Sequence, residues 1–110
     1  MRDTDLIDTK ELKAKLDGGV SVTLVMTLGE WEYRTMHIPG SMRVSTVQEA
    51  LEALDPEDEI VLYDSGPSCP ASRMALRILK DHGYERVRRY PGGLEEWATA
   101  GYPLEGESVE

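Results

Sequence analysis

The chain has 110 residues, of which 40% are hydrophobic and 30% are charged, and this balance suits one globular domain with a modest core rather than a disordered segment. Its 21 acidic and 12 basic side chains give a net charge of −9, which argues against nucleic acid and membrane surfaces as partners because both are polyanionic. One cysteine excludes an internal disulfide framework, and the lack of a long apolar run or a signal-peptide pattern predicts a cytoplasmic protein with no membrane partner.

Hydrophobic periodicity along the chain predicts an α/β protein. The helical segments carry apolar residues three and four positions apart, whereas the strand segments are short, apolar and rich in β-branched residues. In chain order, we expect a helix at 10–16, a strand at 20–26, a helix at 30–36, a short strand at 41–44, a helix at 46–54, a strand at 59–64, a helix at 72–84, a strand at 86–90 and a helix at 92–101. Strands that alternate with helices indicate a mainly parallel sheet, and ligands of such sheets bind beyond the carboxyl ends of the strands.

The segment 60–73, which reads IVLYDSGPSCPASR, joins the strongest strand to an amphipathic helix. The strand stops at Asp64, and a loop of mostly small residues follows before the helix, namely Ser65, Gly66, Pro67, Ser68, Cys69 and Pro70. A strand, a loop of this kind and a helix N-terminus in this order form a cradle for an anion, because backbone N–H groups converge there. Arg73, just past the loop, is a candidate anion-binding residue, and an exposed arginine on the first helical turn is an equally good interpretation.

Three stretches resemble the rhodanese-like family of sulfurtransferases: EWEYRTMHIPGS at 30–41, the segment 60–84, and VRRYPGGLEEWATAGYPLE at 87–105. Their order and spacing fit this family over nearly the whole chain. The resemblance implies a rhodanese-like α/β fold in which a central, mostly parallel, five-stranded sheet has helices on both faces. We therefore expect a single domain at 1–105, followed by a loose C-terminal tail at 106–110.

In that family, a cysteine directly after the corresponding strand takes a sulfane sulfur, typically from thiosulfate, as a persulfide and passes it to cyanide or a thiol. The resemblance places Asp64 at this nucleophile position and residues 65–70 in the catalytic loop. Met26 and Leu28 also replace an Asp-x-Arg stretch of the family, and Met36 replaces a glycine, although these changes leave the expected fold intact.

A carboxylate at position 64 cannot hold a persulfide, because it has no sulfur to bond to. It can accept hydrogen bonds from the loop amides, and it suits the N-terminus of a helix. The sequence therefore favours a catalytically impaired member, in which Asp64 fills the cradle and the loop face keeps a binding or regulatory role. An ordinary turn or N-cap aspartate is the alternative interpretation of this residue.

Cys69 is the rival nucleophile. Pro70 suits the first helical position, which would place Cys69 at the N-cap, where the helix dipole favours a thiolate. An ionised Asp64 nearby would oppose this effect. An active sulfurtransferase that uses Cys69 as its sulfur carrier therefore remains an alternative. A phosphatase-like anion site ranks below both, because it too needs a cysteine at position 64.

The expected partners are thiosulfate or a persulfide as sulfur donor, a thiol as acceptor, and a protein that binds the loop face. No cofactor or metal is expected, because the two histidines have no cysteine or carboxylate at ligand spacing. His37 is expected to hold the HIPGS turn through a hydrogen bond. The side chains expected to pack in or near the core include Trp31, Tyr33, Tyr90 and Trp97, and the helix at 72–84 is expected to turn inward Met74, Ala75, Ile78 and Leu79.

Overall fold

The computed structural model describes residues 5–19, 21–44 and 46–108. It has the helices α1 (Thr9–Asp17), α2 (Glu30–Thr35), α3 (Val47–Ala53), α4 (Ala71–Asp81) and α5 (Gly93–Thr99), and the strands β1 (Thr23–Met26), β2 (Met42–Arg43), β3 (Ile60–Tyr63) and β4 (Val87–Tyr90). Every predicted element is found, with ends that differ by a few residues. Within the described ranges, no helix is long and apolar enough to cross a membrane.

The four strands form one parallel sheet in the order β2-β1-β3-β4, which confirms the α/β class. The expected count of five strands is wrong for the described residues. Beside β4, where a fifth strand would pair, Leu6 makes a single parallel bridge to Arg89, and the Ile7 N–H donates to the Arg89 carbonyl. The pairing stops there because Asp8 already caps α1, its side chain accepting a hydrogen bond from the Glu11 N–H.

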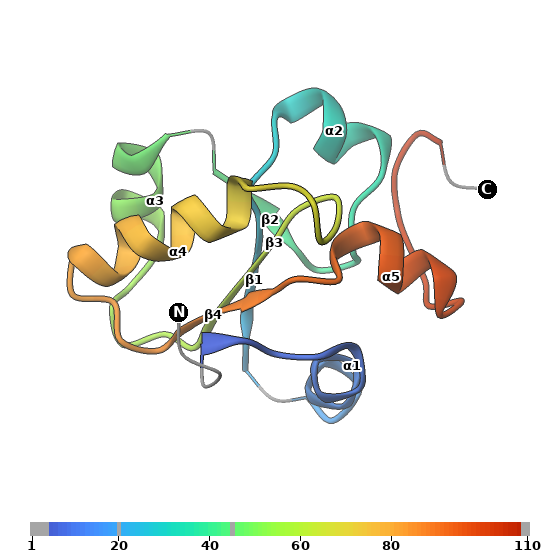
Figure 1. Ribbon diagram of the computed structural model, residues 1–110, viewed down its shortest axis with the longest axis horizontal. Helices are drawn as coiled ribbons and strands as arrows, with labels where there is room; N and C mark the ends of the chain where they lie inside the picture. Colours follow the sequence, from blue (N-terminus) through green and yellow to red (C-terminus); the bar gives the residue numbers. More distant parts are fainter. Residues whose placement is uncertain (1–4, 20, 45, 109–110) are drawn as a thin grey trace.

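The sheet is covered on both faces, as Figure 1 shows, with α1 and α5 on one side and α3 and α4 on the other. Successive residues of a strand point to opposite faces. Val61 and Tyr63 of β3 therefore pack in the core that includes Leu12 of α1 and Trp97 of α5, while Leu62 packs in the core beneath α3 and α4. Strands buried on both sides explain the nearly continuous apolar runs in the sequence.

Two predictions about side-chain orientation are wrong. Met74 is 61% exposed, and Leu76 is buried in its place. The buried stripe of α4 runs through Ser72, Leu76 and Leu79, and Met74 lies two positions from Leu76, on the opposite side of the helix. Trp31 is 74% exposed, because α2 is a short helix at the surface with no fully buried residue.

The C-terminal segment packs against α2, as Figure 1 shows. The backbones of His37 and Glu105 pair in both directions, and the N–H groups of Glu107 and Ser108 donate to the carbonyls of Arg34 and Thr35. Glu107 and Ser108, within the segment predicted to be a loose tail, are therefore hydrogen-bonded to the end of α2. The rest of that tail, 109–110, lies outside the described residues.

Candidate functional site

The site begins where β3 ends, because the alternation of the strand aims Asp64 at α4. Leu62 faces the core beneath α4, and Asp64, two residues later, points the same way. Arg89 of β4 is the register partner of Leu62 and points to this face as well. The Asp64 side chain is 0% exposed. A buried carboxylate is costly unless hydrogen bonds compensate for its lost hydration.

Those hydrogen bonds come from both sides of the loop. Oδ1 of Asp64 accepts from the Gly66 N–H at 3.2 Å, while Oδ2 accepts from the Ser72 N–H at 2.9 Å and from the Ser72 hydroxyl at 2.7 Å. The Ser72 oxygen in turn accepts from Nε of Arg89 at 2.7 Å. The carboxylate therefore occupies the entrance to α4 and is linked through one hydroxyl to a buried guanidinium.

The loop itself is a tight turn. The Cys69 N–H donates to the Gly66 carbonyl at 3.1 Å, and Gly66 is the one buried residue between 65 and 70. The sequence predicts that the amides of residues 65–70 converge on Asp64, but among them only the Gly66 amide donates to its carboxylate. The second amide donor is Ser72, in the first turn of α4. Ser65, Pro67, Ser68 and Pro70 are exposed, so the loop presents a small neutral surface outward.

Cys69 lies one residue farther from the helix than predicted. α4 begins at Ala71 with Pro70 as its N-cap, so Cys69 precedes the cap instead of forming it. Pro70 has helical backbone angles, which extends the turn by one residue before the regular hydrogen-bond pattern begins. The Cys69 thiol is free and half-buried.

The start of α5 holds the other side of the loop. The Leu94 N–H donates to the Asp64 carbonyl at 3.0 Å, and the Glu95 N–H donates to the Ser65 carbonyl at 2.9 Å. Gly93 makes this approach possible, because it has φ +60° and a β-carbon there would lie within 3.0 Å of the backbone of Asp64, Ser65 and Gly66. The pair Gly92-Gly93 thus shapes the loop, a contribution that its sequence did not reveal.

Tyr63 joins the site to the turn after α2. Its hydroxyl accepts from the Ile38 N–H at 3.0 Å and bonds to the Ser41 hydroxyl at 2.8 Å, while burial raises the pKa of Tyr63 to about 12. His37 holds the same turn, as predicted, with Nδ1 2.7 Å from the Tyr33 carbonyl oxygen and its ring stacked on Tyr33. The end of β3 is therefore held to the neighbouring turn by the hydrogen bonds of the Tyr63 hydroxyl.

Ser72 and Arg89 are the functional residues that the sequence analysis missed. Ser72 lies four residues before the buried Leu76, so helical spacing alone placed it on the inward face of α4. Arg89 lies two residues after the buried Val87, and strand alternation placed it on the same face of the sheet. Arg73, which the sequence analysis offered for anion binding, is exposed and lines a separate pocket along α4, away from the Asp64 carboxylate.

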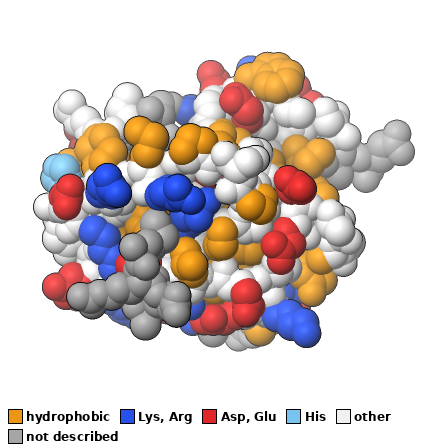
Figure 2. Space-filling view, viewed as in Figure 1, with side chains coloured by type: hydrophobic (Ala, Val, Ile, Leu, Met, Phe, Trp, Pro, Cys, Tyr) orange, Lys and Arg blue, Asp and Glu red, His pale blue; other side chains and the backbone are white. Residues whose placement is uncertain are grey.

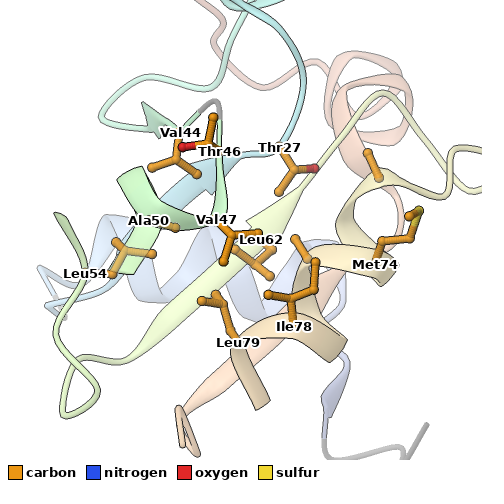
Figure 3. Close-up of a pocket in the computed structure, with 12 residues that line it drawn as sticks. Thr27, Val44, Thr46, Val47, Ala50, Leu54, Leu62, Met74, Ile78 and Leu79 are labelled. Atoms are coloured by element: carbon orange, nitrogen blue, oxygen red, sulfur yellow. The ribbon is translucent and has the colours of Figure 1, made fainter. Parts of the chain in front are cut away.

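A second, apolar pocket lies between α3 and α4, with a volume of about 270 Å³ (Figure 3). Val47 and Ala50 line it from α3, Met74 and Ile78 line it from α4, and Leu62 forms part of its floor. Ala71, the first residue of α4, also lines it, so this pocket begins beside the helix entrance that holds Asp64.

Comparison with known proteins agrees with this fold. A family model described as "Rhodanese-like domain" matches residues 8–100. The solution structure of the rhodanese-like domain of Alr3790 from Anabaena sp. superposes with a TM-score of 0.86 at 28% identity, over 98% of this chain and 82% of that one.

Two curated proteins are similar in sequence. The HTH-type transcriptional regulator Rv0324 of Mycobacterium tuberculosis is 36% identical over 103 residues, which are 92% of this chain and 45% of that protein. YrkF of Bacillus subtilis, named as a candidate sulfur carrier protein, is 29% identical over 94 residues, which are 83% of this chain and 49% of that protein. The chain thus spans about half the length of the curated relatives that it matches.

Proposed function

Since this chain belongs to the rhodanese-like domain family, we propose that it is a member with impaired sulfurtransferase activity, in which Asp64 stands at the position of the persulfide-forming cysteine. The loop face at 65–70 then serves binding or regulation. The observation that supports this most directly is the Asp64 carboxylate itself, which is fully buried and bonded to Gly66 and Ser72 at the entrance to α4.

The chemistry of the family explains why this residue matters. In an active member, a thiolate attacks the outer sulfur of thiosulfate, a new S–S bond forms, and sulfite leaves with the electron pair of the broken S–S bond. An acceptor such as cyanide or a thiol then removes the outer sulfur and restores the thiolate. A carboxylate oxygen offers no sulfur for the persulfide, so the first step has no nucleophile at position 64.

The carboxylate also opposes the binding of thiosulfate. The donors that would stabilise an anion at the entrance to α4, the N–H groups of Gly66 and Ser72 and the Ser72 hydroxyl, already serve Asp64. Two like charges about 4 Å apart at an effective dielectric constant near 20 repel by roughly 4 kcal/mol, which is about a thousandfold in binding. The filled cradle therefore excludes the sulfur donor as well as lacking the nucleophile.

The alternative is an active sulfurtransferase that carries sulfur on Cys69. The half-buried, free thiol of Cys69 lies in the same loop, and this position is the observation that favours the alternative. Its sulfur donor would be thiosulfate or a persulfide, and its acceptor would be a thiol. The similarity to a candidate sulfur carrier protein is compatible with either proposal.

The proposed function is tested by placing a thiol at position 64. Thiosulfate-to-cyanide transfer is measured as thiocyanate formation for the parent chain, for Asp64→Cys and for Asp64→Ser, each also with Cys69→Ser. We expect detectable transfer in Asp64→Cys, because the donors around position 64 favour a thiolate. The rate should be low, because a site misplaced by about 1 Å costs on the order of a hundredfold.

Asp64→Ser separates the effect of removing the charge from the effect of adding a thiol. A folded Asp64→Cys that is no more active than Asp64→Ser would contradict the proposal of a retained cradle. Transfer by the parent chain that disappears in Cys69→Ser, together with a mass gain of one sulfur atom on Cys69 after thiosulfate treatment, would establish the alternative instead.

A further inference from the structure

A pocket of about 490 Å³ lies along α4 on the side away from the apolar pocket, and basic side chains predominate in its lining although the chain is acidic. Four of its lining side chains are basic and one is acidic: Arg73, Arg77, Lys80, Arg89 and Asp5. Leu6 and Leu76 complete the wall. The lining is therefore positive, whereas the chain as a whole carries a net charge of −9.

Helical spacing brings three of the cations to this pocket. Arg73, Arg77 and Lys80 are four and three residues apart, so they lie in one row on α4. Figure 2 shows Lys and Arg side chains gathered on this face of the molecule. Arg73 and Arg77 are exposed, and no carboxylate of residues 5–19, 21–44 or 46–108 lies within ion-pair distance of either one.

Arg89 forms the inner wall of the pocket and is 4% exposed. Its guanidinium makes one hydrogen bond to a described residue, from Nε to the neutral hydroxyl of Ser72, and its Nη2 is buried without a partner among those residues. Buried polar groups are rarely left without partners, and a buried charge is the most costly case. The position of Arg89 is therefore the second, independent indication of an anionic ligand.

Asp5 forms an ion pair with Lys80 at one end of the pocket. Its Oδ1 lies 3.1 Å from Nζ of Lys80, in the last turn of α4. Arg73 lies in the first turn of α4, two helical turns away from Lys80, and Arg77 lies between them. At the end nearest to Ser72, the Asp64 carboxylate is separated from the Arg89 guanidinium by the Ser72 hydroxyl, so Arg73 and Arg89 place two cations there against one carboxylate.

We propose that this pocket binds a small divalent oxyanion of the sulfate or phosphate type. Planar guanidinium groups donate pairs of N–H groups that match the spacing of oxygens in such ions. Arg73 and Arg77 supply these donors from the rim, and Arg89 supplies positive charge from the wall. The pocket lining contains no residue of the loop 64–70, and its one link to Asp64 is the hydrogen-bond chain from Arg89 through the Ser72 hydroxyl.

The test is a titration of the ¹⁵N-labelled chain with sodium sulfate, and separately with sodium phosphate, at an ionic strength held constant with sodium chloride. We expect saturable chemical-shift changes in the amides of residues 73–80 and in Nε–H of Arg89. The double variant Arg73→Gln/Arg77→Gln should raise the dissociation constant by about tenfold or more, because it removes two charged donors.

Arg34→Gln is the matched control, because Arg34 is an exposed arginine on α2, outside this pocket. It should leave the dissociation constant unchanged, and the single variant Arg77→Gln should give an intermediate value if the double variant does not fold. Shifts that do not saturate, that are equal in the parent and Arg77→Gln, or that centre on residues 64–70 would overturn the proposal. Binding of a polyanion such as heparin without binding of either small ion would overturn it too.

Discussion

The two faces of the sheet each hold one carboxylate near an arginine of β4, but they do so in opposite ways. On the α1 face, the guanidinium of Arg88 meets Glu11 directly, with nitrogen–oxygen distances of 2.7 and 3.2 Å, and also donates to the Leu6 carbonyl. On the α4 face, the guanidinium of Arg89 reaches Asp64 only through the Ser72 hydroxyl. The first pair lies at the surface, and the second is buried.

The two guanidinium groups differ in the partners that compensate for their buried nitrogen atoms. Each guanidinium keeps one buried nitrogen that has no partner in the described part of the chain, Nε in Arg88 and Nη2 in Arg89. Arg88 has a carboxylate and a carbonyl to compensate for this, whereas Arg89 has one neutral hydroxyl among the described residues. The Asp64 carboxylate is in turn held by backbone amides instead of a cation. The buried Asp64 cluster on the α4 face thus depends on the geometry of its loop, whereas the Arg88–Glu11 contact on the α1 face is an ion pair at the surface.

Gly93→Ala should disrupt the loop around Asp64 most severely. A left-handed backbone conformation costs a residue with a β-carbon about 1–2 kcal/mol, and the clash with the backbone of residues 64–66 should raise the loss of unfolding free energy to about 3 kcal/mol or more. Urea denaturation measures this loss. Gly83→Ala is the control, because Gly83 has φ +88° with nothing within 4 Å of the added atom, and it should cost about 1 kcal/mol. Equal losses in the two variants would mean that α5 does not hold the loop.

Asp64→Ala should remove the carboxylate that accepts hydrogen bonds from Gly66 and Ser72, and it should leave the backbone of the loop in place. The N–H groups of Gly66 and Ser72 would lose their partner, and such buried groups cost about 1–3 kcal/mol, with the low end expected if water fills the space. The free energy of unfolding is compared with that of Asp81→Ala, an exposed aspartate at the end of α4 that should cost little. A neutral or stabilising result for Asp64→Ala would show that the carboxylate is not bonded there.

Glu11→Gln should have the smallest effect, because the pair that it breaks is exposed. The hydrogen bond from Arg88 lowers the pKa of Glu11 below its usual value of 4.5. A carboxyl with a lowered pKa in the folded chain adds stability above the pKa of the unfolded chain and loses it as the pH falls through the lower, folded value. We expect a difference between parent and Glu11→Gln of about 0.5 kcal/mol at pH 7, and a smaller one at pH 3. A difference that grows toward acid pH would contradict this assignment.

Local patterns in the sequence were enough to predict the elements and the class of fold. The strand predicted at 59–64 is observed at Ile60–Tyr63, and the helix predicted at 72–84 is observed at Ala71–Asp81. Hydrophobic periodicity carries this information because an element must turn its apolar face to the core wherever that core lies. The loop at 65–70 and its place beyond the end of a parallel strand followed from the same patterns.

The tertiary structure alone decided which side chains meet. Asp64, Ser72 and Arg89 come from a loop, a helix and a strand, and only the register of β3 with β4 and the packing of α4 on both bring them together. The exposure of Met74 and Trp31 likewise depended on which face of each helix found a neighbour. The described part of the sheet has four strands because α1 begins directly after its cap at Asp8, so Leu6 makes one bridge to β4 and no fifth strand forms. Spacing along the chain predicts which residues share one face of an element. Contacts between elements depend on long-range register and packing, which local periodicity does not specify.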